Sequence, residues 1–286
     1  MTTETRPNSF RKLFFGLFVF PLVIAVGMAV LLCAVVLMTS ESETPDSLIA
    51  AIKTGSPSKR WQKAYELSNE LNRRAPEARS ERLMDEIISI LGDARRYDAK
   101  TRGYMALALG RWDREKAVQA LSRAAADPSS EVVVYALWSL AGIGSPSGIP
   151  AASGALKHED PDIRKTAAYA LGLMSGDTVR PALAAALKDP VDDVRWNAAL
   201  ALARHGDGAG REELNRMLDR SHLSGALGLN EARIEQTMIN AARGLALIPE
   251  PSSIRILESL SREDRSLKVR QAAITALQEI RKAQAS

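Results

Sequence analysis

The stretch that decides the fold is DIRKTAAYALGLMSGD, residues 162–177, because a near copy of it, DVRWNAALALARHGD, occupies residues 193–207. Counting from Arg164 in the first copy and from Arg195 in the second, alanine recurs at the third, fourth and sixth following positions and leucine at the seventh. Positions 0, 3, 4 and 7 share one face of an α-helix. Each copy therefore predicts a helix whose small-residue face allows close approach of a second helix.

The same pattern recurs along most of the chain, which indicates a fold built from repeats. Its starting positions are 60, 102, 133, 164, 195, 238 and 270, with arginine at all but 133 and 238. A glycine or aspartate stop and a second amphipathic segment follow several copies, as in GLMSGD at 172–177, and Asp-Pro closes several units, as at 127–128 and 189–190. Each unit reads as a helical hairpin that buries its apolar face only by stacking on its neighbours.

The units IRKTAAYALG…VRPALAAALKD, beginning at 163, and VRWNAALALARHGD, beginning at 194, resemble HEAT repeats of the short variety known as PBS-lyase HEAT-like repeats. The resemblance covers residues 56–286 and implies an all-α solenoid of about seven hairpins, whose second helices line a concave face. It also implies that the recurring arginine bonds an acidic or carbonyl group of a neighbouring unit, with Asp177 and Asp207 as candidate partners. Some members attach bilins to proteins and most are scaffolds, so no particular chemistry follows.

An uncharged run of 28 residues, 13–40, precedes the repeats. A bilayer core about 30 Å thick needs about 20 apolar helical residues, so this run predicts a transmembrane helix. It is too long for the apolar region of a cleaved signal peptide, and no A-x-A pattern ends it. Arg6, Arg11 and Lys12 precede it. The positive-inside rule then makes 1–12 a cytoplasmic tail of an inner-membrane protein, and it places a linker at 41–55 and the repeats at 56–286 outside the cytoplasm.

Composition argues against several functions. Acidic and basic residues nearly balance, 34 against 38, without a run of five like charges, so we expect no nucleic-acid partner. The single cysteine, Cys33, excludes an internal disulfide and a thiolate zinc cluster. The histidines at 158, 205 and 222 lack metal-ligand spacing, and no phosphate-binding glycine loop is evident. We therefore expect no catalytic residue, no metal, no cofactor and no enzyme activity.

Two sets of residues are candidates for binding a protein partner. The first set is aromatic and lies at or near the fifth position after the pattern start: Tyr65, Trp138, Tyr169 and Trp196. Aromatic side chains are favoured binding anchors, although packing between adjacent first helices is the alternative. The second set comes from the second helices, as the expected concave face: Lys116, Arg123, Arg180, Lys188, Arg211 and Arg216.

The sequence thus predicts a single-pass membrane protein whose solenoid is a scaffold that docks a membrane-embedded or envelope-associated protein. An enzyme or enzyme accessory of the bilin-lyase type is the alternative, and a homo-oligomer formed through the anchors is a third hypothesis. The unit starting at 195 is longer than its predecessor, with extra residues around 219–232. That insertion is either a functional loop or an extended second helix.

Overall fold

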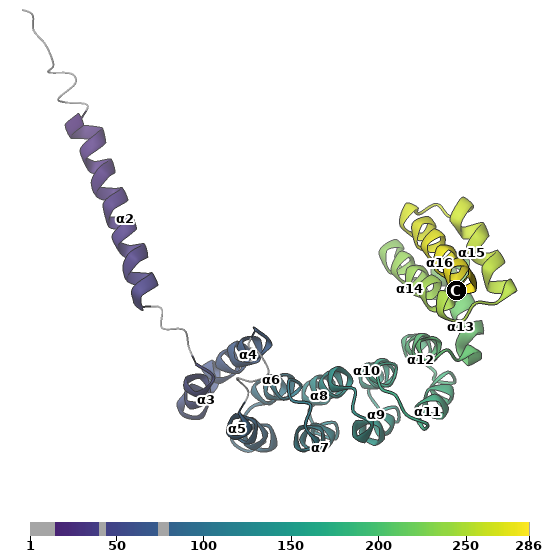
Figure 1. Cartoon of the computed structure of the whole chain (residues 1–286), viewed down its shortest axis with the longest axis horizontal. Coiled ribbons are helices and arrows are strands. Elements are labelled where there is room, and N and C mark those ends of the chain that lie inside the picture. The colour runs from purple at the N-terminus through teal and green to yellow at the C-terminus, as the bar shows by residue number, and fades with distance from the viewer. Residues whose placement is uncertain (1–14, 40–43, 74–79, 286) are drawn as a thin grey trace, which may run out of the picture. The chain divides into compact units, whose positions relative to one another are not determined.

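The computed structural model describes residues 15–39, 44–73 and 80–285, so the predicted cytoplasmic tail at 1–12 lies outside the described residues (Figure 1). The chain divides into two compact units, Met1–Thr44 and Pro45–Ser286. In the first, a π-helical turn, η1 (Phe15–Val19), leads into α2 (Phe20–Thr39). Within the described residues, Gly16–Val35 is the one span that is long and apolar enough to cross a membrane, with a mean hydropathy of 2.8 and no buried part.

The second unit consists of α-helices joined by short turns, and its described residues contain no strand. The all-α solenoid predicted from the repeats is confirmed. Its α-helices are α3 (Pro45–Thr54), α4 (Pro57–Arg73), α5 (Glu81–Gly92), α6 (Ala99–Leu109), α7 (Glu115–Ala124), α8 (Ser130–Ile143), α9 (Ile149–Ala155), α10 (Pro161–Leu171), α11 (Val179–Ala186), α12 (Asp192–Arg204), α13 (Arg211–Arg216), α14 (Glu231–Leu247), α15 (Pro251–Glu263) and α16 (Leu267–Ala285). Three short turns, η3 (Pro146–Gly148), η4 (Gly208–Gly210) and η5 (His222–Ala226), lie between them.

The helices of this unit form two rows, and the row that carries the repeated pattern lies on the inner side of the curve (Figure 1). Helices α4, α6, α8, α10 and α12 pack closely on one another, whereas the outer helices α5, α7, α9 and α11 contact one another far less. A stack bends toward the side where its members are closer, and alanine and glycine shorten the spacing on the pattern side. The helices that the sequence assigned as second helices therefore lie on the outer side, and the expectation that they line the concave face is wrong.

The repeat boundaries are shifted by one helix from the predicted hairpins. Helix α6 packs more extensively on α5, which precedes it, than on α7, and α10 likewise packs more on α9 than on α11. Counted this way, the described residues contain seven pairs, from α3–α4 to α15–α16. The first pair includes α3, where the sequence predicted a linker over 41–55. Helix α3 belongs to the solenoid because it buries Leu48, Ile49 and Ile52.

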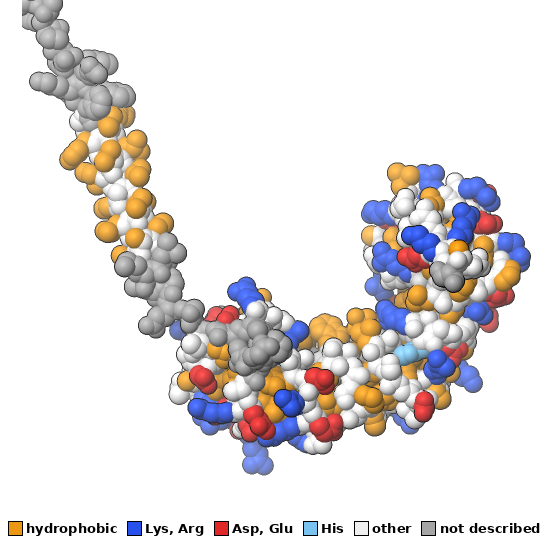
Figure 2. All heavy atoms as spheres, viewed as in Figure 1, with side chains coloured by type: hydrophobic (Ala, Val, Ile, Leu, Met, Phe, Trp, Pro, Cys, Tyr) orange, Lys and Arg blue, Asp and Glu red, His pale blue; other side chains and the backbone are white. Residues whose placement is uncertain are grey.

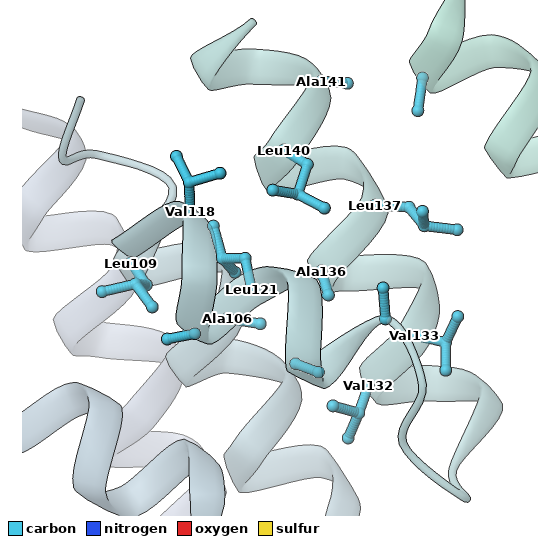
Figure 3. Packing of buried hydrophobic residues seen from close by; sticks show 14 of the residues in the cluster. Ala106, Leu109, Val118, Leu121, Val132, Val133, Ala136, Leu137, Leu140 and Ala141 are labelled. Atoms are coloured by element: carbon cyan, nitrogen blue, oxygen red, sulfur yellow. The ribbon is translucent and has the colours of Figure 1, made fainter. Parts of the chain in front are cut away.

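Buried alanine and leucine side chains fill the space between the two rows (Figure 3). Figure 3 shows Leu109 of α6, Leu121 of α7 and Leu140 of α8 in one part of this core, and each is at most 1% exposed. The buried residues fall into two clusters that meet at α12, to which that helix contributes on both sides. The C-terminal helices α13–α16 thus have a core of their own.

Arg102, Arg164 and Arg195 form a ladder, as the family resemblance implied for the recurring arginines, but with other partners than expected. Arg102 pairs with Asp127, with 3.1 Å between Nη2 and Oδ1. Arg164 pairs in the same way with Asp189, and Arg195 of the next unit donates to the Asp189 carbonyl at 2.8 Å. Burial opposes ionisation of the Asp189 carboxyl and is the largest single effect on its pKa. The hydrogen bonds from Arg164 and from the Val191 amide, together with the charges of Arg164 and Arg195, outweigh burial and lower that pKa. For Arg102 and Arg164 the partners are thus the aspartates of the Asp-Pro pairs. Arg195 also pairs with Glu213 at 3.2 Å, and Arg60 donates to the Arg96 carbonyl at 2.9 Å.

The insertion around 219–232 does not extend the second helix, because α13 ends at Arg216 and α14 begins at Glu231. It contains the π-helical turn η5, whose Leu223 is fully buried. Arg220 donates to both oxygens of Asp264, at 3.1 and 2.7 Å, and also pairs with Glu231. These contacts hold the insertion against the turn between α15 and α16.

Candidate functional site: the inner face of the solenoid

Three positions of each pattern-bearing helix form the inner face: the second, fifth and ninth residues after the pattern start. These positions lie opposite the small-residue face, about 140–200° around the helix from position 0. In α4 to α14 they are Gln62, Tyr65, Asn69, Tyr104, Leu107, Arg111, Tyr135, Trp138, Gly142, Thr166, Tyr169, Leu173, Asn197, Leu200, Arg204, Asn240, Arg243 and Leu247. All but Thr166 are exposed or half-buried.

A continuous row of aromatic rings crosses the N-terminal half of this face. The Tyr65 and Tyr104 rings meet edge to face with 5.3 Å between centroids, and Tyr104 stacks on Tyr135 at 5.8 Å. Tyr135 in turn meets Trp138 edge to face at 5.7 Å. The row thus joins three successive inner helices, α4, α6 and α8, and contacts of this kind add to the apolar burial of each ring.

The rings of the row are partly buried against one another and partly exposed to solvent. Gly103 allows the Tyr135 ring to lie against α6, because a Cβ at residue 103 would be 2.4 Å from that ring. Burial raises the pKa of the Tyr135 hydroxyl, and the neighbouring Tyr104 adds to the effect. Tyr65 and Trp138 are nevertheless each 48% exposed. The rings are therefore held in place by one another while their outer surfaces remain accessible.

Tyr169 continues the inner face beyond the row. It is 39% exposed, and the guanidinium of Arg204 lies 5.4 Å from its ring centroid. Trp196, in contrast, is 7% exposed and belongs to the C-terminal core, so it is not a surface residue as the sequence suggested. Tyr104 and Tyr135 were not among the site residues predicted from the sequence. The second position after the pattern start would have identified them.

The cations predicted from the second helices lie on the outer row, away from the aromatic row. Four of them hold contacts within the solenoid. Lys116 pairs with Asp85 at 2.5 Å, a hydrogen bond that raises the pKa of its ammonium, and Arg211 pairs with Glu250 at 3.1 Å. Arg216 pairs with Glu213 and Arg180 donates to the His205 carbonyl. Arg123 and Lys188 are exposed on the same outer side.

The inner face differs in charge from the rest of the chain, which has 34 acidic and 38 basic residues. From α4 to α14 its positions include no carboxylate, and its cations are Arg111, Arg204 and Arg243. Hydrophobic side chains gather on this side of the middle of the array (Figure 2). No group of three or more His, Cys, Asp or Glu among the described residues is placed to hold a metal ion. The face thus combines exposed aromatic rings with few charges, a composition that is favoured in protein–protein interfaces.

The family model for HEAT repeats matches three overlapping stretches, residues 84–154, 123–203 and 150–224. Together they cover α5 to α13 except for the first three residues of α5. These helices include the units with the most regular spacing. Residues 84–224 thus match HEAT repeats, and the fold of the described solenoid is that of HEAT-like helical hairpins.

Solved structures agree with this fold. One chain of the complex of CpcE and CpcF of phycocyanin lyase from Nostoc sp. PCC7120 is 20% identical, the match covers 85% of this chain and 96% of that chain, and the TM-score is 0.53. The Escherichia coli protein YibA is 14% identical, covers 96% of this chain and 99% of its own, and has a TM-score of 0.52. At these identities the likeness concerns the fold alone. The comparison with curated proteins found no match.

Proposed function

We propose that this protein is a membrane-anchored scaffold that holds a partner protein on the inner face of its solenoid. The observation that carries the proposal is the aromatic row from Tyr65 to Trp138, which is fixed by ring contacts and Gly103 yet half exposed. A preformed aromatic surface binds with little loss of conformational entropy. Binding requires no catalytic group, so the proposal includes no enzyme activity. The likeness to a phycocyanin lyase complex concerns the fold and does not extend that activity to this chain.

The proposed anchor is α2, with Gly16–Val35 as the membrane span. The cations Arg6, Arg11 and Lys12 favour a cytoplasmic N-terminus, and the solenoid then lies outside the cytoplasm. Only five residues, 40–44, separate α2 from α3. A solenoid on so short a connection acts close to the bilayer, which favours a membrane-embedded or envelope-associated partner.

The topology is tested by reporter fusions at residue 286 in a Gram-negative host. An alkaline phosphatase fused there is expected to be active, because it folds only outside the cytoplasm, whereas a fluorescent protein that matures only inside is expected to be dark. The matched control places both reporters after residue 12, before the apolar run. The opposite pattern of activities at residue 286 would overturn the proposed orientation.

The binding surface is tested by photo-cross-linking of the full chain in intact cells. A benzoyl-phenylalanine at position 138 or 169 keeps an aromatic ring on the inner face, and we expect both to give the same adduct with one partner. Gln119, exposed on the outer helix α7, is the control position and is expected to give no such adduct. Equal adducts from position 119, or none from 138 and 169, would contradict binding on the inner face.

A further inference from the structure

The C-terminal end of the inner face differs from the aromatic row in both shape and charge. A groove of about 890 Å³ lies between α14 and α16. Ile239 and Leu247 line it from α14, and Leu267 and Ala272 line it from α16. Leu247 is 54% exposed and Leu267 72% exposed. Such side chains offer a bulky apolar group a surface to bury against.

Arg243 gives this groove its charge. Its side chain is exposed at the fifth position of α14, where α4, α8 and α10 carry Tyr65, Trp138 and Tyr169. Arg243 makes no hydrogen bond or ion pair with the described residues. The other charged groups of the groove are Lys268, which pairs with Glu235 at 3.1 Å, and Glu279.

Glu279 likewise makes no hydrogen bond or ion pair with the described residues, so Arg243 is the cation of the groove that has no partner within the described solenoid. A guanidinium binds a carboxylate through two parallel hydrogen bonds, and the pair is stronger beside apolar surface than in open water. Arg204, on the adjacent helix α12, adds a second exposed cation on the same face. The N-terminal half of the face has an uncharged aromatic row instead. The two ends of the inner face therefore favour different side chains of a partner, apolar ones at the aromatic row and an acidic one at α14.

We propose that the groove between α14 and α16 binds a bulky apolar side chain of the partner together with a neighbouring Asp or Glu, whose carboxylate pairs with Arg243. The partner segment is thus a peptide with apolar residues along the aromatic row and an acidic residue at the end that meets α14. This inference rests on the proposed function, because it specifies the partner of the same inner face.

The test is selection of a displayed library of random 16-residue peptides on the full chain in nanodiscs of uncharged phosphatidylcholine. Enriched peptides are expected to carry Asp or Glu next to a large apolar residue. Selection on Arg243→Glu is expected to lose the acidic residue, whereas Arg255→Glu, at an exposed arginine of the outer helix α15, is expected to leave it unchanged. Circular dichroism of both variants verifies that the helices remain.

The pairing itself is measured with the most enriched peptide and its Asp→Asn or Glu→Gln version. We expect the amide to lower affinity about tenfold for the wild type and to have no effect for Arg243→Glu. Enriched peptides without acidic residues, or the same loss in both proteins, would overturn the inference. If Trp138→Ala then still weakens binding, the proposed function stands and only the inference about Arg243 fails. If no peptide is enriched, or if binding depends on neither residue, both proposals fail.

Discussion

Replacing Arg220 by alanine is expected to destabilise the C-terminal helices of the solenoid by about 3–5 kcal/mol, the usual cost of leaving a buried charge without its partner. The Asp264 side chain is 4% exposed and receives two hydrogen bonds from Arg220. Without them its carboxylate has no guanidinium to offset the loss of solvation. Because α13–α16 have a core of their own, the loss is expected to be local.

Hydrogen exchange followed by mass spectrometry measures this effect helix by helix in the full chain. Protection is expected to fall in α14, α15 and α16 and to stay unchanged in α4 to α8. The control is Arg265→Ala, which removes an exposed pair with Glu231 and is expected to cost less than about 1 kcal/mol. Equal effects of the two substitutions would show that the Arg220 pair does not hold the insertion in place.

A single added methyl at Gly210 is expected to cost about 1–3 kcal/mol. A Cβ there would lie 2.6 Å from the Cα and 2.9 Å from the Cβ of Ala199 on α12, and this backbone cannot move without separating α12 from α13. The backbone of Gly210 has a φ of −88°, which any residue adopts, so the cost comes from the contact alone. Urea denaturation of Gly210→Ala followed by circular dichroism measures it.

The same substitution at Gly154 is the matched control. Gly154 lies within α9, where an added Cβ would meet nothing within 4 Å. Alanine has the higher helix propensity, so Gly154→Ala is expected to stabilise the protein by about 0.5–1 kcal/mol. If Gly210→Ala shifted the urea midpoint in the same direction as Gly154→Ala, the close approach of α12 would not be needed for stability.

The repeated pattern predicted most of the fold, because the spacing of Ala167, Ala168 and Leu171 is the helical packing face itself. The pairing of helices was predicted one helix out of phase. A hairpin joined by a short turn is the natural reading of a sequence, yet α6 packs mainly on α5, across the longer connection at 93–98. How extensively two helices pack depends on the shape of their apolar surfaces, and the length of the connection between them does not predict it.

The candidate site was predicted in part. Tyr65, Trp138 and Tyr169 were found because the repeat defines a fifth position that points away from the core. Trp196 was assigned to the surface because it follows Arg195, but the C-terminal core encloses it. The outer cations were chosen because the curvature was assigned to the wrong side. Curvature depends on the difference in spacing between two rows, which no single unit reveals.

By itself the sequence determined the helices, the number of repeats, the small-residue faces and an apolar N-terminal run of membrane-spanning length. These follow from local periodicity, since each helix carries its own pattern. Only the tertiary structure decided which row faces inward, that Asp127 and Asp189 receive the arginines, and that four rings from α4, α6 and α8 form one row. Those features join residues 25 to 40 positions apart, and their geometry is set by how closely neighbouring helices can approach.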